Sequence, residues 1–208
     1  KVVVPSNPYD AKGLLIQSIR DNDPVIFLEH KALYTMEGEV PEELYTVPFG
    51  EAAVVREGND VTIVAIGRMV QKAQEAAAEL QKAGVQCEII DPRTTSPLDT
   101  DTILESVEKT GRLIVVDESH PRCSMASDIA GLVAAIAFDS LKAPIRQITG
   151  PHAPVPFSDS LSLPDAWPIT SCIAVVNSSP SDAHFSLRAA SSGDHANSDR
   201  TAGVADLS

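Results

Sequence analysis

The chain has little of what marks a nucleic-acid-binding or membrane protein. Its 208 residues hold 16 Lys and Arg against 29 Asp and Glu, a formal net charge of −13. Such an acidic balance opposes attraction to nucleic acid and to anionic lipid. No stretch approaches the roughly 18 apolar residues of a membrane span, and no basic-then-apolar signal segment opens the chain. We therefore expect a cytoplasmic protein without nucleic-acid or membrane partners. Because the first residue is Lys1 and not Met, we also expect a fragment or a processed piece.

Cysteine is scarce, and its spacing excludes a zinc site. The three cysteines, Cys87, Cys123 and Cys172, lie far apart, without a CxxC pair or a Cys/His ligand spacing. A glycine-rich phosphate loop and a G-x-S-x-G nucleophile elbow are also missing from the sequence. We expect buried, reduced thiols. His120, which follows Asp117, Glu118 and Ser119 after an apolar run, is expected to be a histidine of a surface loop.

The middle of the chain alternates strand and helix patterns. Residues 61–66 form an apolar, β-branched run closed by Gly67, and residues 68–83 carry an apolar stripe at helical spacing before Gly84. A second apolar run at 85–90 completes a strand–helix–strand unit, which predicts a crossover between parallel strands. Further helices are predicted at 98–109 and 124–141, and further strands at 113–116 and 145–148. This alternation predicts an α/β fold, a three-layer α/β/α domain with a mostly parallel sheet.

One antiparallel strand is predicted at the edge of that sheet. Residues 51–56 and 60–66 are two short apolar runs that flank Glu57-Gly58-Asn59. A Gly-Asn turn between two such runs is typical of a β-hairpin. We therefore expect the first of these strands to pair with the second.

The beginning of the chain shows its own strand–helix–strand pattern. Lys1–Val4 is an apolar run, Asn7 and Pro8 are a suitable N-cap and first residue for a helix, and Pro24 ends that helix before a second apolar run. The helix residues expected to point inward are Leu14, Leu15 and Ile19. The first strand is expected to expose its edges and so to cause self-association.

Composition divides the chain into four parts. Residues 1–29 form the first section, and residues 30–50 contain scattered Gly and Pro without a sustained period, which indicates a linker. Residues 51–176 hold the α/β domain. Residues 177–208 are rich in Ser, Ala, Asp and Gly without apolar periodicity, which predicts a disordered tail.

Several segments, in this order, resemble the β subunits of the thiamine-diphosphate-dependent 2-oxo acid dehydrogenase family, which carry a transketolase-like C-terminal domain. These segments are VPSNPYDAKGLL, PVIFLEHKALY, VTIVAIG, AGVQCEIIDPRTTSPLD, KTGRLIVVDE and PHAPVPFSD. Within the family, EHKALYTMEGEVPEELYTVPFGEA and DESHPRCSMASDIAGLVA most resemble acetoin dehydrogenase β subunits. The resemblance implies that residues 1–29 are the end of a pyrimidine-binding α/β domain and that residues 51–176 are the C-terminal domain.

The resemblance also implies an activity. The parent enzyme would cleave acetoin oxidatively with thiamine diphosphate and Mg²⁺, and would pass the two-carbon unit to a lipoyl acyltransferase. Two alternatives stay open: a pyruvate or branched-chain 2-oxo acid dehydrogenase β subunit, and a noncatalytic assembly or docking module. The family's activating Glu and active-site His precede the stretch that begins at Lys1. No residue here is therefore assigned a catalytic or cofactor-binding role, and the piece alone is expected to be inactive.

The implied partners are an α subunit, in a heterotetramer of two α and two β subunits, and a dihydrolipoamide acetyltransferase core. In pyruvate-type relatives, an acidic residue in the turn before the last strand meets a basic domain of that core. Lys142 stands in its place here. Because a lysine repels a basic partner, the sequence favours an acetoin-type core.

A potassium site is implied where the first helix ends. Its ligands would be the carbonyl oxygens of Ser18, Ile19 and Asp21, with a contribution from Asp23. The physical chemistry agrees, because the carbonyls of a last helical turn are unpaired and oxygen ligands suit a hard cation. The alternative is that the same residues only cap the helix and turn the chain.

Overall fold

The structure is a computed structural model and describes residues 1–150. These residues lie in one compact unit. Cys172, the PHAPVPFSD segment and the predicted tail at 177–208 lie outside the described residues.

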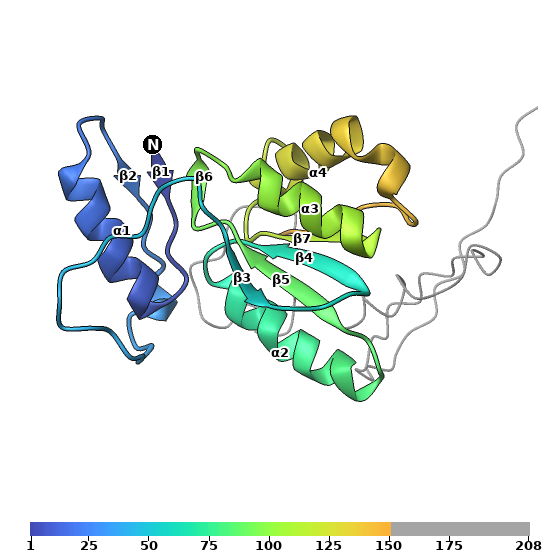
Figure 1. The fold of residues 1–208 in the computed structure, drawn as a ribbon, viewed down its shortest axis with the longest axis horizontal. Helices are drawn as coiled ribbons and strands as arrows, with labels where there is room; N and C mark the ends of the chain where they lie inside the picture. The colour runs from blue at the N-terminus through green and yellow to red at the C-terminus, as the bar shows by residue number, and fades with distance from the viewer. Residues whose placement is uncertain (151–208) are drawn as a thin grey trace, which may run out of the picture. The chain divides into compact units, whose positions relative to one another are not determined.

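The larger sheet has five strands in the order β3-β5-β4-β7-β8 (Figure 1). Four strands are parallel, and β3 is antiparallel at the edge. The α2 helix packs on one face, and α3 and α4 pack on the other. The predicted three-layer α/β fold is confirmed. The elements are β3 (Ala53–Arg56), β4 (Val61–Ala65), α2 (Met69–Lys82), β5 (Cys87–Asp91), α3 (Thr100–Thr110), β7 (Leu113–Val116), α4 (Met125–Ile136), the 3-10 helix η2 (Phe138–Ser140) and β8 (Arg146–Ile148).

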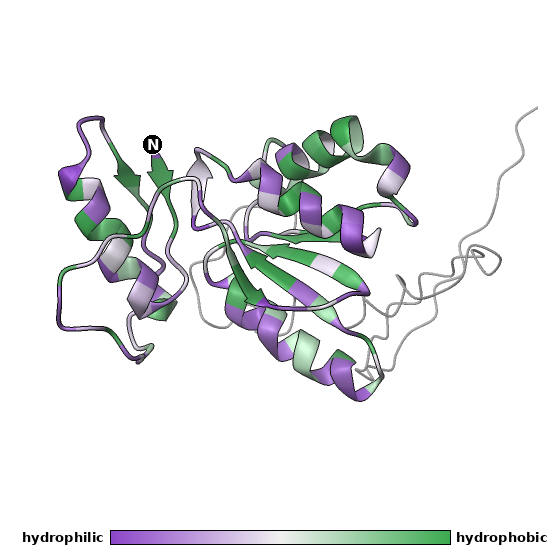
Figure 2. Cartoon of the chain, in the orientation of Figure 1, coloured by the Kyte–Doolittle hydropathy of each residue, from purple (hydrophilic) through white to green (hydrophobic). Residues whose placement is uncertain are grey.

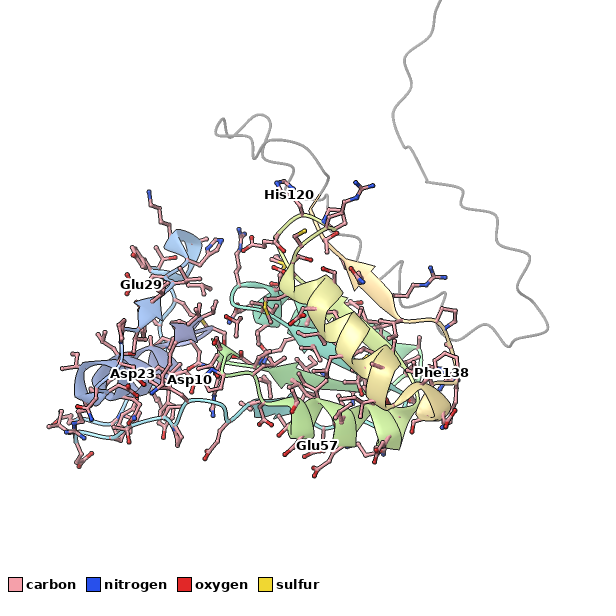
Figure 3. All side chains as sticks on the ribbon, turned by 90° about the horizontal axis from the view of Figure 1, so that it is seen from above. Asp10, Asp23, Glu29, Glu57, His120 and Phe138 are labelled. Carbon is pink, nitrogen blue, oxygen red and sulfur yellow. The ribbon has the colours of Figure 1, made fainter. Side chains whose placement is uncertain are left out.

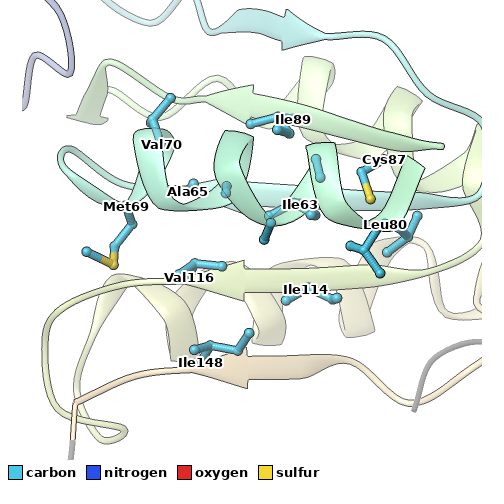
Figure 4. Packing of buried hydrophobic residues seen from close by; sticks show 14 of the residues in the cluster. Ile63, Ala65, Met69, Val70, Leu80, Cys87, Ile89, Ile114, Val116 and Ile148 are labelled. Atoms are coloured by element: carbon cyan, nitrogen blue, oxygen red, sulfur yellow. The ribbon is translucent and has the colours of Figure 1, made fainter. Parts of the chain in front are cut away.

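Alternation along the strands builds the two apolar layers. In β4, Val61, Ile63 and Ala65 pack against α2, whereas Val64 packs against α3 and α4. Figure 4 shows the α2 layer, where Leu80 and Met69 of the helix meet alternate residues of the strands. Both faces of the central strands are therefore buried, which is why their sequences are almost wholly apolar (Figure 2).

The predicted hairpin between β3 and β4 is wrong. The β3 strand pairs with β5, with Ala53 opposite Asp91 and Val54 opposite Ile90. Both edges of β4 are already occupied by the parallel strands β5 and β7, so an antiparallel strand can be added only beyond β5. The connection between β3 and β4 instead crosses the start of β5, where the Asp60 amide donates to the Gln86 carbonyl at 2.9 Å.

A second sheet of three strands joins the first section of the chain to the segment that follows β5. Its order is β2-β1-β6, with β1 (Val2–Val3) between β2 (Ile26–Phe27) and β6 (Thr94–Ser96). Because β1 has a partner on both sides, the expectation that its edges are exposed is wrong. The sequence analysis did not predict β6.

The α1 helix (Pro8–Arg20) begins as predicted, because the Asn7 side chain accepts from the Asp10 amide and Pro8 is the first helical residue. Its burial differs from the prediction. Leu14 is buried against Val3 and Val47, but 45% of Leu15 and 76% of Ile19 are exposed. The small sheet and the segment after the 3-10 helix η1 (Lys31–Leu33) cover only one narrow stripe of α1.

The two cysteines among the described residues differ in burial. Cys87 lies in β5 and is buried, as predicted, whereas Cys123 is exposed, contrary to the prediction. The difference follows from position, because Cys123 precedes α4 in a loop and has a backbone φ of 52°. Within residues 1–150, no helix is long and apolar enough to cross a membrane.

The connection between β3 and β4, which passes the start of β5 at Gly58, gives a stability prediction. A Cβ atom at Gly58 would lie 2.2 Å from the Cys87 carbonyl carbon, so Gly58→Ala should lower the free energy of unfolding by about 2–4 kcal/mol. A Cβ atom at Gly131 in α4 meets nothing within 4 Å. Gly131→Ala is therefore the matched control and should leave stability unchanged or raise it by about 0.5–1 kcal/mol. Urea denaturation measures both, and an equal loss in the two variants would contradict this description of the crossing.

Candidate functional site

The predicted potassium ligands lie at the end of α1, where the structure places a lysine among them. The Lys1 ammonium lies 2.7 Å from an Asp21 carboxylate oxygen and 3.1 Å from one of Asp23. The hydrogen bond from Lys1 lowers the pKa of Asp21, and the bonds to both acids raise the pKa of Lys1. The structure therefore brings the two acids together as predicted, but around an ammonium group that the sequence analysis missed.

The other predicted potassium ligands are main-chain carbonyl oxygens, those of Ser18, Ile19 and Asp21. The Ser18 hydroxyl donates to the Leu14 carbonyl at 2.7 Å, so it belongs to the helix itself. The chain leaves the helix at Asp21, which has an extended backbone, and the last-turn carbonyls keep the negative end of the helix dipole. Oxygen ligands of this kind suit a hard cation in general, whereas the two carboxylates are already paired with Lys1. Among residues 1–150, no cluster of three or more His, Cys, Asp or Glu residues could hold a metal ion.

A cavity of about 370 Å³ lies at the carboxyl ends of β4 and β7. The chain leaves β4 for β5 on one side and later returns to β7 on the other, so this is the switch point of the sheet, where open α/β folds bind ligands. Gly67 and Arg68 after β4, and Asp117 and Glu118 after β7, contribute to its lining. Val4 lines it from the first section of the chain.

His30, just before the 3-10 helix η1, lies at the rim of this cavity. Its Nε2 lies 3.0 Å from a Glu118 carboxylate oxygen, and its Nδ1 accepts from the Ala32 amide at 3.1 Å. Since Nδ1 accepts, Nε2 carries the proton and donates to Glu118. Both ring nitrogens are therefore occupied, which suits a structural connection and leaves no free nitrogen for a general base.

The loop after β7 contains no serine nucleophile site. The Ser119 hydroxyl donates to an Asp117 carboxylate oxygen at 2.5 Å, and the Ser119 amide donates to the other oxygen at 3.1 Å. A nucleophile would need its hydroxyl hydrogen-bonded to a base such as histidine. Figure 3 shows His120 on this loop, which agrees with the prediction of a loop histidine.

Buried polar residues at the junction of the two sheets were missed by the sequence analysis. Ser6 donates to an Asp91 carboxylate oxygen at 2.5 Å, and Arg93 pairs with Asp10 at 2.9 Å. Burial raises the pKa of Asp91 to about 6. The sequence did contain a signal, because Asp91 directly follows the apolar Ile89 and Ile90 in a strand, where a buried charge needs a partner.

Comparison with known proteins decides the family. Residues 50–170 match the family described as the transketolase C-terminal domain, which is more than half of the chain. The chain belongs to this family. A solved structure titled split gene transketolase, inactive beta4 tetramer, is 26% identical with a TM-score of 0.61, over 71% of this chain and 47% of that one.

Curated relatives are more specific. The chain is 65% identical over 161 residues to the acetoin:2,6-dichlorophenolindophenol oxidoreductase subunit beta of Cupriavidus necator, covering 77% of this chain and 48% of the relative. The Bacillus subtilis protein of the same name is 61% identical, with 77% and 47% covered. The pyruvate dehydrogenase E1 component subunit beta of B. subtilis is 51% identical, with 78% and 50% covered.

Two conclusions follow from these similarities. The resemblance to β subunits of this thiamine-diphosphate-dependent family is confirmed, and the acetoin type is more similar than the pyruvate type. The chain spans about half the length of the curated relatives that it matches.

The Lys1 contact gives a testable prediction. In Lys1→Met, the pKa of the Asp21 carboxyl should rise toward its ordinary value, because its main hydrogen-bond donor is lost. An NMR titration of the Asp21 carboxyl carbon measures this change. Lys31→Met is the control, since Lys31 is exposed and forms no ion pair with either acid, both of which pair with Lys1. An unchanged Asp21 pKa in Lys1→Met would show that the ammonium does not hold the acid pair.

Proposed function

We propose that the chain is the C-terminal part of the β subunit of a cytoplasmic, thiamine-diphosphate-dependent acetoin dehydrogenase. The parent enzyme cleaves acetoin oxidatively and transfers the two-carbon unit to a lipoyl acyltransferase. The observation that carries the proposal is the identity of 65% and 61% to two acetoin oxidoreductase β subunits, against 51% to a pyruvate-type subunit.

The described residues have a structural role in this proposal. Thiamine diphosphate, when bound, supplies the carbanion that attacks the substrate carbonyl. The groups described here do not fit that cofactor: within residues 1–150 there is no acidic cluster for Mg²⁺, and the sequence contains no phosphate loop. The α/β domain instead fixes residues 1–29, which belong to the pyrimidine-binding domain in this proposal, through the pairing of β1 with β6. The piece alone is therefore inactive.

The proposed partners are an α subunit, in a heterotetramer, and a dihydrolipoamide acetyltransferase core of the acetoin type. Lys142 supports the choice of an acetoin-type acetyltransferase core over a pyruvate-type one. Its stem packs on Gly111, where a Cβ atom would come within 2.6 Å of it, and its amide donates to the Gly111 carbonyl at 2.8 Å. The lysine is thus held in the turn before β8, where its charge disfavours a basic partner.

We also propose that a potassium ion binds the carbonyl oxygens of Ser18, Ile19 and Asp21, with a contribution from Asp23. The support is chemical, since the donors are main-chain oxygens at the negative end of α1. The Lys1 ammonium competes for the acids but not for these carbonyls.

A chimera tests the enzymatic proposal. The matching 161 residues of the C. necator subunit would be replaced by those of this chain, and the product would be assayed with its α subunit, thiamine diphosphate, Mg²⁺ and an artificial electron acceptor. Acetoin should be turned over in preference to pyruvate, and the isolated chain with the α subunit should give no turnover. Preference for pyruvate would favour the pyruvate-type alternative. An assembled but inactive chimera would favour a noncatalytic module, and turnover by the isolated chain would refute the claim that catalytic groups are missing from it.

Thermal unfolding tests the cation site. The melting temperature should be higher in KCl than in NaCl at equal ionic strength, because ion binding to the folded state alone stabilises it. The difference should grow in Lys1→Met, where the competing ammonium is gone. Identical melting temperatures in the two salts for both proteins would contradict the potassium proposal and leave the simple helix cap.

A further inference from the structure

Four polar side chains form a buried cluster where the first section of the chain meets the α/β domain. Ser6 comes from the segment between β1 and α1, and Asp10 comes from the first turn of α1. Asp91 ends β5, and Arg93 lies in the turn after it. Ser6, Asp10 and Asp91 are at most 2% exposed, and the Arg93 side chain is 20% exposed. Figure 3 shows Asp10 at the end of α1 nearer the α/β domain, whereas Asp23 lies at the other end.

Arg93 contacts both the end of β5 and the first section of the chain. Its amide donates to Asp91 at 2.9 Å, its carbonyl accepts from the Val4 amide at 2.9 Å, and its guanidinium lies 2.9 Å from Asp10. Its φ is 60°, a left-handed conformation that is strained for a residue other than glycine. The three contacts together offset that strain. The turn is therefore shaped by its docking to residues 1–10.

The charges in the cluster balance only when Asp91 is protonated. Asp10 from α1 and Arg93 from the turn are the charged groups that face Asp91. The neighbouring strand β3 places Ala53 opposite it, and α2 contributes the uncharged Gln71, which donates to the Ser6 carbonyl at 2.5 Å. With Asp91 ionised, two buried carboxylates share one guanidinium, and a buried unbalanced charge is unfavourable.

We propose that this cluster is a proton-sensitive joint between residues 1–29 and the α/β domain, closed when Asp91 is protonated and loosened when it ionises. The joint is a property of the chain itself and does not depend on the identity of the substrate.

The direction of the pH dependence follows from linkage. Burial raises the pKa of Asp91 from 3.8 to about 6 in the docked state. A group with a raised pKa binds its proton more tightly when docked, so its contribution is complete below about pH 4 and is lost as the pH rises through about 6. A shift of this size corresponds to a change of about 100-fold in the docking equilibrium.

Amide hydrogen exchange at Val4 reports on the joint, because this amide donates to the Arg93 carbonyl across it. Exchange would be measured at about pH 5 and at about pH 8. At each pH, protection is the exchange rate of an unstructured peptide divided by that of the protein. We expect Val4 protection to fall by about 10-fold from pH 5 to pH 8, because pH 5 lies about one unit below the docked pKa of Asp91 and each unit corresponds to a factor of about ten. The Ile66 amide, bonded to the Val116 carbonyl inside the larger sheet, should keep its protection.

Asp91→Asn should abolish this dependence, because asparagine stays neutral. Its amide oxygen can accept from the Arg93 amide, and its NH₂ group can donate to the Ser6 hydroxyl oxygen, as a protonated Asp91 would. Asp139→Asn, at an exposed position, is the matched control and should behave like the unmodified chain. Val4 protection that does not vary with pH in the unmodified chain, or varies equally in Asp91→Asn, would overturn the proposal. If Asp91→Asn does not fold, a carbon-13 titration of Asp91 in the unmodified chain decides: a pKa near 6 supports the joint, and one near 4 overturns it.

Discussion

The placement of β1 between β2 and β6 is the constraint on which the rest of the structure depends. Val2 and Val3 pair in parallel with β2 on one side and antiparallel with β6 on the other. Two strands of two residues each could not form a stable sheet alone. The third strand comes from the α/β domain, so the first section of the chain is folded because the domain provides its edge.

The same junction explains where polar groups are buried. Inside the α/β domain, buried hydroxyls satisfy one another, as Thr62 does with Ser106 at 2.7 Å and with Thr110 at 2.8 Å. Glu88, at the start of β5, pairs with Lys109 of α3. At the junction, by contrast, two acids and one arginine meet, and they balance only with a proton. A buried carboxylate without full compensation is expected where two parts of a chain are coupled and not where a core is only packed.

Much of the α/β domain could be predicted because its elements follow local rules. Apolar runs such as 61–66 predict buried strands, and Gly111, at a φ of 73°, ends α3 in the left-handed conformation that glycine favours at helix ends. Strand pairing was predicted less well. The hairpin at Gly58 failed because the neighbour of β3 is decided by which edge of the sheet is free, and the local sequence does not contain that information. The β6 strand has only three residues, all of them polar, so its sequence shows no recognisable strand pattern.

The candidate site shows the same division between local and long-range information. The acids at 21 and 23 could be placed from the sequence, because they follow a helix end. Their partner Lys1 is distant in sequence and is brought to them by the pairing of β1 and β2. Leu15 and Ile19 were predicted to be buried because helical periodicity identifies an apolar face without identifying what covers it.

Limited proteolysis between the two parts tests most directly the claim that residues 1–29 are held by the α/β domain. A glutamate-specific protease would cut the exposed stretch that contains Glu37, Glu39, Glu42 and Glu43. Size-exclusion chromatography with mass spectrometry would then show whether the pieces stay together. The structure predicts that the N-terminal piece elutes with the α/β domain after the cut, since β1 pairs with β6 and Arg93 contacts Asp10. Separation of the two pieces under native conditions would contradict the account.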